Sequence, residues 1–156
     1  MTTPGPATQP LDPEPPHWRP LMTESTTLAA LRLADLPALN QPLEGGTFAG
    51  LITTPEGKHC AVVLLADKPE KRLAWKAAMK WAEDLAATLP TRPVAAMLFA
   101  NAKTSFEPEW HWTCEQLDRS CAWVQDFAGG YQGDRGHKSY EGRARAVRLI
   151  PVGAKT

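Results

Sequence analysis

The sequence has no long hydrophobic run: nowhere do about 18 consecutive apolar residues occur, the length that a membrane-spanning helix requires. It also has no basic N-terminal segment leading into an apolar stretch, so we expect no signal peptide and synthesis in the cytoplasm. Charge of neither sign is in excess, because 17 basic residues balance 17 acidic ones. Without net positive charge the chain lacks long-range attraction to nucleic acid, so DNA and RNA are not expected partners.

Motifs for catalysis and metal binding are also missing. The three cysteines, Cys60, Cys114 and Cys121, have no CxxC spacing, which argues against a disulfide framework and a structural zinc site and favours reduced thiols. The histidines show neither HExxH nor HxH spacing, and the sequence has no GxSxG elbow and no phosphate-binding glycine loop. We therefore expect no catalytic residues, no cofactor and no metal.

The first twenty residues are rich in proline and nearly devoid of aliphatic side chains. Such a composition favours extended conformers and cannot build a hydrophobic core. Residues 1–30 are therefore predicted to form an N-terminal arm, which we expect a larger assembly to hold. His17 and Trp18 carry the only aromatic rings among the first twenty residues, and they are the candidate anchors to a partner.

The middle of the chain alternates between strand and helix patterns. Residues 47–54 and 58–65 flank a Pro-Glu-Gly turn and predict a hairpin, after a short strand or helix near residues 26–33. Apolar residues then recur at helical spacing from Trp75 to Ala86. Thr91 can cap a second helix, in which Pro93 falls in the first turn.

The C-terminal half predicts further strands. Residues 110–116 and 121–127 each alternate with period two and should form a second hairpin. If its turn centres on Leu117-Asp118, Cys114 lies opposite Cys121. A last strand over residues 143–150 is expected to end at Pro151. Segregated helices and strands indicate an α+β fold, here one domain over residues 31–152 with a tail at 153–156.

The glycine-rich stretch 129–142 has too little aliphatic mass to be core, and we expect a surface loop or a ligand-binding edge. It mixes amphipathic rings with hydrogen-bonding groups, as recognition surfaces do, although a merely solvated loop fits equally well. His111, between Trp110 and Trp112, should point away from both rings. The candidate partner-binding residues are Tyr131, Gln132, Asp134, Arg135, His137, Tyr140 and His111.

Five short segments occur in an order that resembles the Lcl C-terminal-domain family, domain of unknown function number 1566. They are GGTFAGL at 45–51, LPTR at 89–92, WHWT at 110–113, AWVQDF at 122–127 and ARAVR at 144–148, so the resemblance covers about Leu36 to Ile150. The GGTFAGL opening and the GRARAVR ending are most similar to the phage-type version. One departure is Val94, where relatives tend to carry Glu, so a capping box with Thr91 is missing.

The resemblance implies a C-type-lectin-like fold, with two helices packed on antiparallel hairpins. True C-type lectins bind calcium through a pair of motifs, and only the first of them has a partial counterpart here, Glu107-Pro108-Glu109. A calcium ion requires six or more converging oxygens, which the sequence does not indicate. The family is distantly related to formylglycine-generating enzymes, whose copper-binding cysteine pair only Cys114 and Cys121 could represent, and their match is poor.

The expected function is thus non-catalytic recognition by a phage or prophage protein, virion-associated in a tail or receptor-binding role. Its partner would be a protein of the phage assembly or host, or a surface glycan, and the chain would be part of an oligomer or larger assembly. One alternative is an intracellular phage protein that binds and modulates a host protein. An enzyme related to the formylglycine generators is the other.

Overall fold

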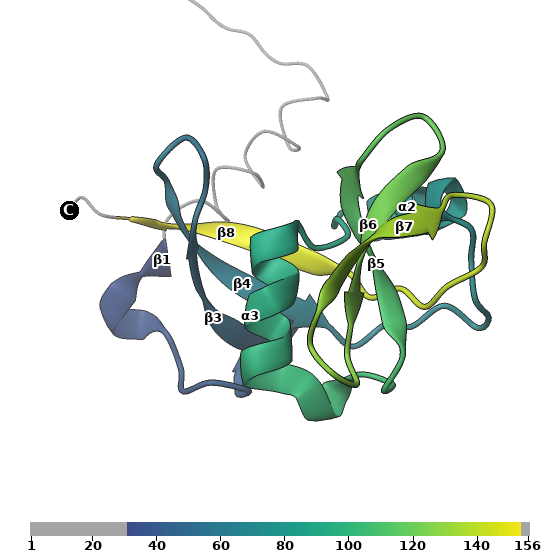
Figure 1. Ribbon diagram of the computed structural model, residues 1–156. Coiled ribbons are helices and arrows are strands. Elements are labelled where there is room, and N and C mark those ends of the chain that lie inside the picture. Colours follow the sequence, from purple (N-terminus) through teal and green to yellow (C-terminus); the bar gives the residue numbers. More distant parts are fainter. Residues whose placement is uncertain (1–30, 154–156) are drawn as a thin grey trace, which may run out of the picture.

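The computed structural model describes residues 31–153 and contains two sheets and two α-helices (Figure 1). The first sheet has the strand order β1-β8-β4-β3-β2, and the second has the order β5-β6-β7. The first sheet is built from β1 (Leu31–Arg32), β2 (Pro42–Leu43), β3 (Gly46–Thr53), β4 (His59–Leu65) and β8 (Val147–Gly153). A short 3-10 helix, η2, follows β1 at Leu33–Asp35. The α+β class predicted from the sequence is confirmed.

Strands β3 and β4 form the predicted antiparallel hairpin at the centre of the first sheet. Every residue of β4 except His59 is buried, as expected for a strand covered on both faces. The last strand, β8, returns from the far end of the chain to pair antiparallel with β4, and β1 pairs with β8 in parallel. The two ends of the described chain therefore meet in one sheet.

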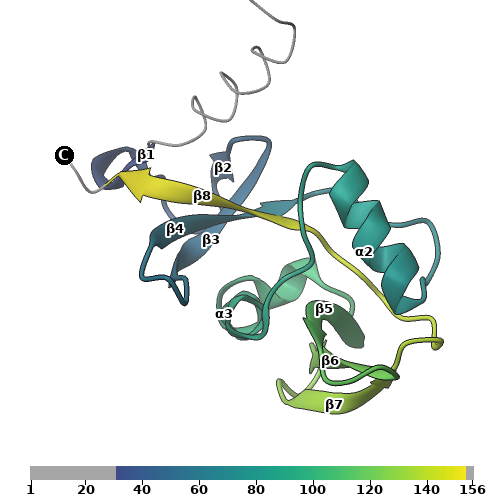
Figure 2. The same cartoon turned by 90° about the horizontal axis from the view of Figure 1, so that it is seen from above.

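The two predicted helices are present as α2 (Trp75–Asp84) and α3 (Arg92–Ala102), and the 3-10 helix η3 (Lys103–Ser105) extends the latter. Thr91 caps α3 as expected, since its hydroxyl accepts a hydrogen bond from the amide of Val94 at 3.3 Å. Helix α3 contacts β3 of the first sheet and β5 and β6 of the second, so it lies between the sheets (Figure 2). It thereby joins the two halves of the core.

The second sheet contains β5 (Trp110–Gln116), β6 (Cys121–Asp126) and β7 (Gln132–His137). The first two confirm the second predicted hairpin, whereas β7 corrects the expected loop over residues 129–142. Glycine is needed in β7, because a Cβ on Gly136 would lie 2.7 Å from Cγ1 of Val124 on the neighbouring strand. A glycine-rich strand has a weak hydrophobic pattern, so its sequence looks like a loop.

Two expectations about the strand ends are wrong. The hairpin turn places Cys121 opposite Leu117, whose amide donates to the Cys121 carbonyl at 2.9 Å, so Cys114 does not face Cys121. Both thiols are free. Pro151 does not end the last strand but lies inside β8, opposite Cys60. Proline is tolerated in a strand where its missing N–H is not required. Strand β8 continues beyond Pro151, where it pairs with β1.

The core has two parts on either side of the first sheet's central strands. One is built around Trp75, Trp112 and Leu89, and the other around Leu98, Phe106 and Phe127.

None of the helices in residues 31–153 is both long and apolar enough to cross a membrane.

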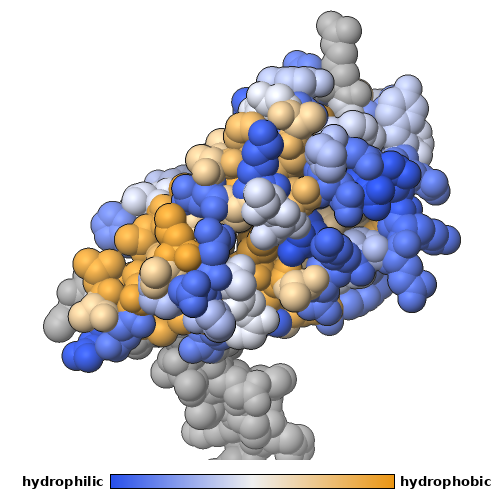
Figure 3. Space-filling model, turned by 90° about the horizontal axis from the view of Figure 1, so that it is seen from below, coloured by the Kyte–Doolittle hydropathy of each residue, from blue (hydrophilic) through white to orange (hydrophobic). Residues whose placement is uncertain are grey.

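The surface also differs between the two halves. Seen from below, hydrophobic residues gather on the half under the five-stranded sheet, whereas the half under β5–β7 is mostly hydrophilic (Figure 3). Large exposed apolar side chains in the N-terminal part include Leu33, Leu39 and Leu51.

Candidate functional site

An open groove of about 370 Å³ lies on the second sheet, within the size range of pockets that bind small ligands or single side chains. Its lining combines three aromatic rings, two carboxylates, one aliphatic side chain and two glycines. These residues are Trp110, Val124, Asp126, Tyr131, Gly133, Asp134, Gly136 and Tyr140. We call this feature the aromatic groove.

Strand register puts the floor of the aromatic groove on one face of the sheet. Trp110 pairs with Asp126, and Val124 pairs with Gly133. Residues that oppose each other across neighbouring strands point to the same face, so the ring of Trp110 lies beside the carboxylate of Asp126. Because Gly133 and Gly136 carry no side chain, the strand β7 can pack closely beside Val124.

Trp110 is held in place by close packing. Its ring meets Trp112 edge to face, with the centroids 5.1 Å apart. A Cβ on Gly142 would come within 2.2 Å of the Trp110 ring, so only glycine fits there. The buried Trp112 is itself anchored by a 2.8 Å hydrogen bond from its Nε1 to the carbonyl of Leu73. The position of Trp110 in the groove is therefore fixed by contacts within the protein.

Two exposed tyrosines form the outer walls of the aromatic groove. Tyr131 is 68% exposed and Tyr140 is 59% exposed. Large aromatic rings this exposed are uncommon unless they contact a partner, since burial of one ring is worth several kcal/mol. A turn at residues 126–131 presents Tyr131, and there the Asp126 carboxylate accepts a hydrogen bond from the Gly129 amide. The tyrosines thus offer apolar area that a partner could cover.

Three of the predicted binding residues, Tyr131, Asp134 and Tyr140, come together in the aromatic groove. His137 lies next to it, with its ring 5.4 Å from that of Tyr140. Gln132 does not join them. Its side-chain nitrogen donates to the carbonyl of Arg92 at 2.7 Å and its oxygen accepts from the same residue's Nε at 3.0 Å, a structural bridge to α3.

His111 points away from Trp110 and Trp112, as expected, and is 4% exposed. Its Nδ1 donates to the carbonyl of Glu109 at 3.0 Å, and its ring packs edge-on against Phe106 and Phe127. Burial, helped by the neighbouring charges of Arg145 and Arg143, lowers the pKa of His111 to about 4. His111 is therefore a neutral core residue, remote from the groove.

The other predicted contacts cannot be placed. Arg135 belongs to β7, but its side chain lies outside what the structure describes. His17 and Trp18, the expected arm anchors, also lie outside the described residues.

Sequence reasoning missed Trp110, Val124 and Asp126 as members of the groove. A signal for them existed, because the predicted hairpin already placed Trp110 and Asp126 at its open end. The missing information was β7: without that third strand, Tyr131 and Asp134 could not be brought beside the hairpin.

Within residues 31–153, no group of three or more His, Cys, Asp or Glu side chains is placed to hold a metal ion. Burial raises the pKa of the Cys114 thiol, and burial also raises that of Cys60. Such thiols are poor nucleophiles at neutral pH, because the thiolate is the reactive form. The groove itself combines apolar rings with carboxylates, which is suited to binding.

No protein-family model matches the chain, and a search of the curated proteins finds no match.

Proposed function

We propose that the chain is a non-catalytic recognition protein with a C-type-lectin-like scaffold, of phage or prophage origin and associated with the virion. The scaffold proposal is supported by the order of the elements. A hairpin precedes two helices, a second sheet follows them, and the last strand returns to the first sheet. Phage origin and virion association rest on the ordered sequence segments that resemble the phage-type family. A Pro-rich arm over residues 1–30 would tether the domain to the particle.

The aromatic groove is the observation that carries the recognition role. We assign to it a protein partner that inserts a basic side chain, because three rings and two carboxylates line the groove and none of the lining side chains that the structure describes is basic. A cation over a tyrosine or tryptophan face is worth roughly 0.5–2 kcal/mol. Asp126 and Asp134 add charge complementarity at the rim. Exposed tyrosines that become buried are typical hot spots of protein interfaces.

Site-specific photo-crosslinking tests this assignment. A photoreactive phenylalanine analogue would replace Tyr131 or Tyr140 in cells that produce the protein, with the same analogue at Leu51 as a matched control on the other sheet. Leu51 is 47% exposed, so all three positions reach solvent. We expect one protein adduct from the two groove positions and none from Leu51.

The identity of the adduct separates the alternatives. A phage structural protein supports the virion role, and a host protein favours an intracellular modulator of host physiology. Crosslinking to a glycan would show that the groove binds a sugar rather than a basic side chain. Equal labelling at all three positions, or none at Tyr131 and Tyr140, would remove the groove as the recognition site.

Virion association has its own test. If the gene is carried by a phage, mass spectrometry of purified particles should detect the chain. Its absence from particles, together with a monomeric state in size-exclusion chromatography, would contradict that part of the proposal.

A further inference from the structure

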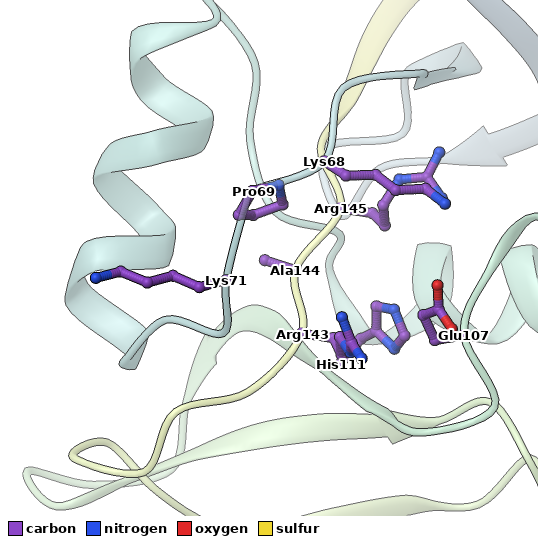
Figure 4. Close-up of a pocket in the computed structure, with 8 residues that line it drawn as sticks. All are labelled: Lys68, Pro69, Lys71, Glu107, His111, Arg143, Ala144 and Arg145. Carbon is purple, nitrogen blue, oxygen red and sulfur yellow. The ribbon is translucent and has the colours of Figure 1, made fainter.

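A second cavity, unrelated to the aromatic groove, lies where the segment after β4 crosses the segment before β8. Its volume is about 40 Å³, room for one small ion or chemical group rather than a whole ligand. Its lining is rich in cations and contains a single carboxylate. The residues are Lys68, Pro69, Lys71, Glu107, His111, Arg143, Ala144 and Arg145 (Figure 4).

Arg145 is the central feature of this basic cavity. The residue is 6% exposed, and its guanidinium donates to two neutral backbone carbonyls, those of Ser105 and Leu65. Its Nε–H is buried and meets no acceptor in the described part of the chain. Buried charges are normally paired with an opposite charge, because removing a charge from water is costly. Within residues 31–153 no carboxylate forms a salt bridge with Arg145, and the charge of Asp67 acts on it only from beyond salt-bridge distance.

The other cations differ in what they contribute. Arg143 is compensated by Glu109, with a nitrogen–oxygen distance of 3.1 Å. Lys68 lies alongside Arg145 in the close-up, whereas the side chain of Lys71 points away from the cavity toward α2 (Figure 4). Lys68 and Arg145 therefore give the basic cavity its unbalanced positive charge.

His111 and Glu107 complete the lining. Burial lowers the pKa of His111 and keeps its ring neutral at physiological pH, and the charges of Arg145 and Arg143 act in the same direction. Glu107 is the one carboxylate, and it forms no ion pair with any residue between 31 and 153. The cavity thus has one acid at its edge and a buried guanidinium with no salt-bridge partner among the described residues.

We propose that the basic cavity binds a small oxyanion, the size of one carboxylate or one phosphate group, as the counter-ion of Arg145. Guanidinium groups suit such anions because their N–H donors match the spacing of carboxylate and phosphate oxygens. Lys68 contributes the second positive charge at the entrance, and Glu107 competes with the anion. The site is independent of the proposed recognition function.

Thermal unfolding of the full chain at neutral pH, supported by calorimetry, tests the site. The probes are sodium phosphate and sodium acetate, each against sodium chloride at equal ionic strength. A bound oxyanion raises the unfolding temperature in a saturable way, because ligands that bind only the folded state stabilise it. Stabilisation by phosphate alone identifies a phosphate group as the natural ligand chemistry, and stabilisation by acetate identifies a carboxylate.

Three variants make the test specific. Lys68→Met should weaken anion binding about tenfold, the effect of losing one charged hydrogen bond, whereas Lys71→Met should leave it unchanged. Both positions are exposed, so neither substitution threatens folding. Glu107→Gln should strengthen binding, because it removes the competing carboxylate.

Three results would overturn the proposal. The first is no saturable effect of phosphate or acetate beyond that of chloride. The second is an equal loss in the Lys68 and Lys71 variants. The third is binding by the Glu107→Gln variant alone, which would show that Glu107 itself occupies the site in the native protein.

Discussion

His111 makes the stability of the folded chain depend on pH, because its ring is buried in the neutral form. Burial lowers the pKa of His111 to about 4, with Arg145 and Arg143 contributing, while the Glu109 carbonyl that accepts from Nδ1 works in the opposite direction. In an unfolded chain the pKa of histidine is about 6.5. Between these two values the unfolded chain binds more protons, so lowering the pH favours unfolding.

The size of the effect follows from the two pKa values. The full contribution is present above about pH 6.5, about 2 kcal/mol of it is lost by pH 5, and about 3 kcal/mol by pH 4. Urea unfolding followed by tryptophan fluorescence, at constant ionic strength between pH 7.5 and 5, measures it. Glu109 contributes little in this range, because its carboxylate is largely ionised above pH 5 both in the unfolded chain and in the folded one, where hydrogen bonds from Arg143 and Arg72 lower its pKa to about 2.

The control is His111→Gln, which keeps a polar side chain but cannot titrate. Its free energy of unfolding should be nearly constant from pH 7.5 to 5, although lower at every pH because the contacts with Phe106 and Phe127 are lost. A wild-type protein equally stable at both pH values would refute the reasoning. So would a His111→Gln variant with the wild-type slope.

Other substitutions probe the packing. Gly142→Ala should cost about 1–3 kcal/mol in urea unfolding, since its Cβ must displace the ring of Trp110, and a cost near zero would contradict that contact. Val94→Glu would restore the capping box of the family pattern. We nevertheless expect it to destabilise the fold by more than about 2 kcal/mol, because Val94 is 1% exposed and burying a carboxylate costs more than a cap contributes. A Val94→Glu variant as stable as the wild type would be inconsistent with the burial. Alkylation of the protein denatured without reductant should label all three cysteines, and protection of Cys114 and Cys121 would reveal a disulfide that the structure does not contain.

Local patterns were sufficient for most of the fold. The alternation in residues 47–65 and the helical spacing after Trp75 predict β3, β4 and α2, because each element buries one regular face. The cap at Thr91 marks the beginning of α3 for the same local reason. These features depend on neighbours in sequence, so a single chain reveals them.

Features that depend on distant partners were not predictable. Strand β7 has glycine at two of its six positions, and only the adjacent β6 shows why Gly136 must be small. The cysteine pairing depended on where the hairpin turn begins, which a shift of one or two residues changes. The aromatic groove forms only because β7 lies beside Trp110. Its tyrosines were candidates from the composition of the segment, whereas the residues of its floor could not be identified without that strand pairing. The basic cavity joins segments that lie more than 30 residues apart in the sequence, so no local pattern indicates that Arg145 is buried there.

Amide chemical-shift mapping of the aromatic groove tests the central claim most directly. The isotopically labelled chain would be titrated with the acetylated amides of lysine and arginine, and with the uncharged norleucine derivative as control. We predict shifts confined to the backbone around Asp126, Gly133 and Gly136 with the basic probes, absent with norleucine, and lost in the Tyr131→Ser/Tyr140→Ser double variant. Shifts elsewhere, or equal shifts in the double variant, would contradict recognition of a basic side chain by this groove.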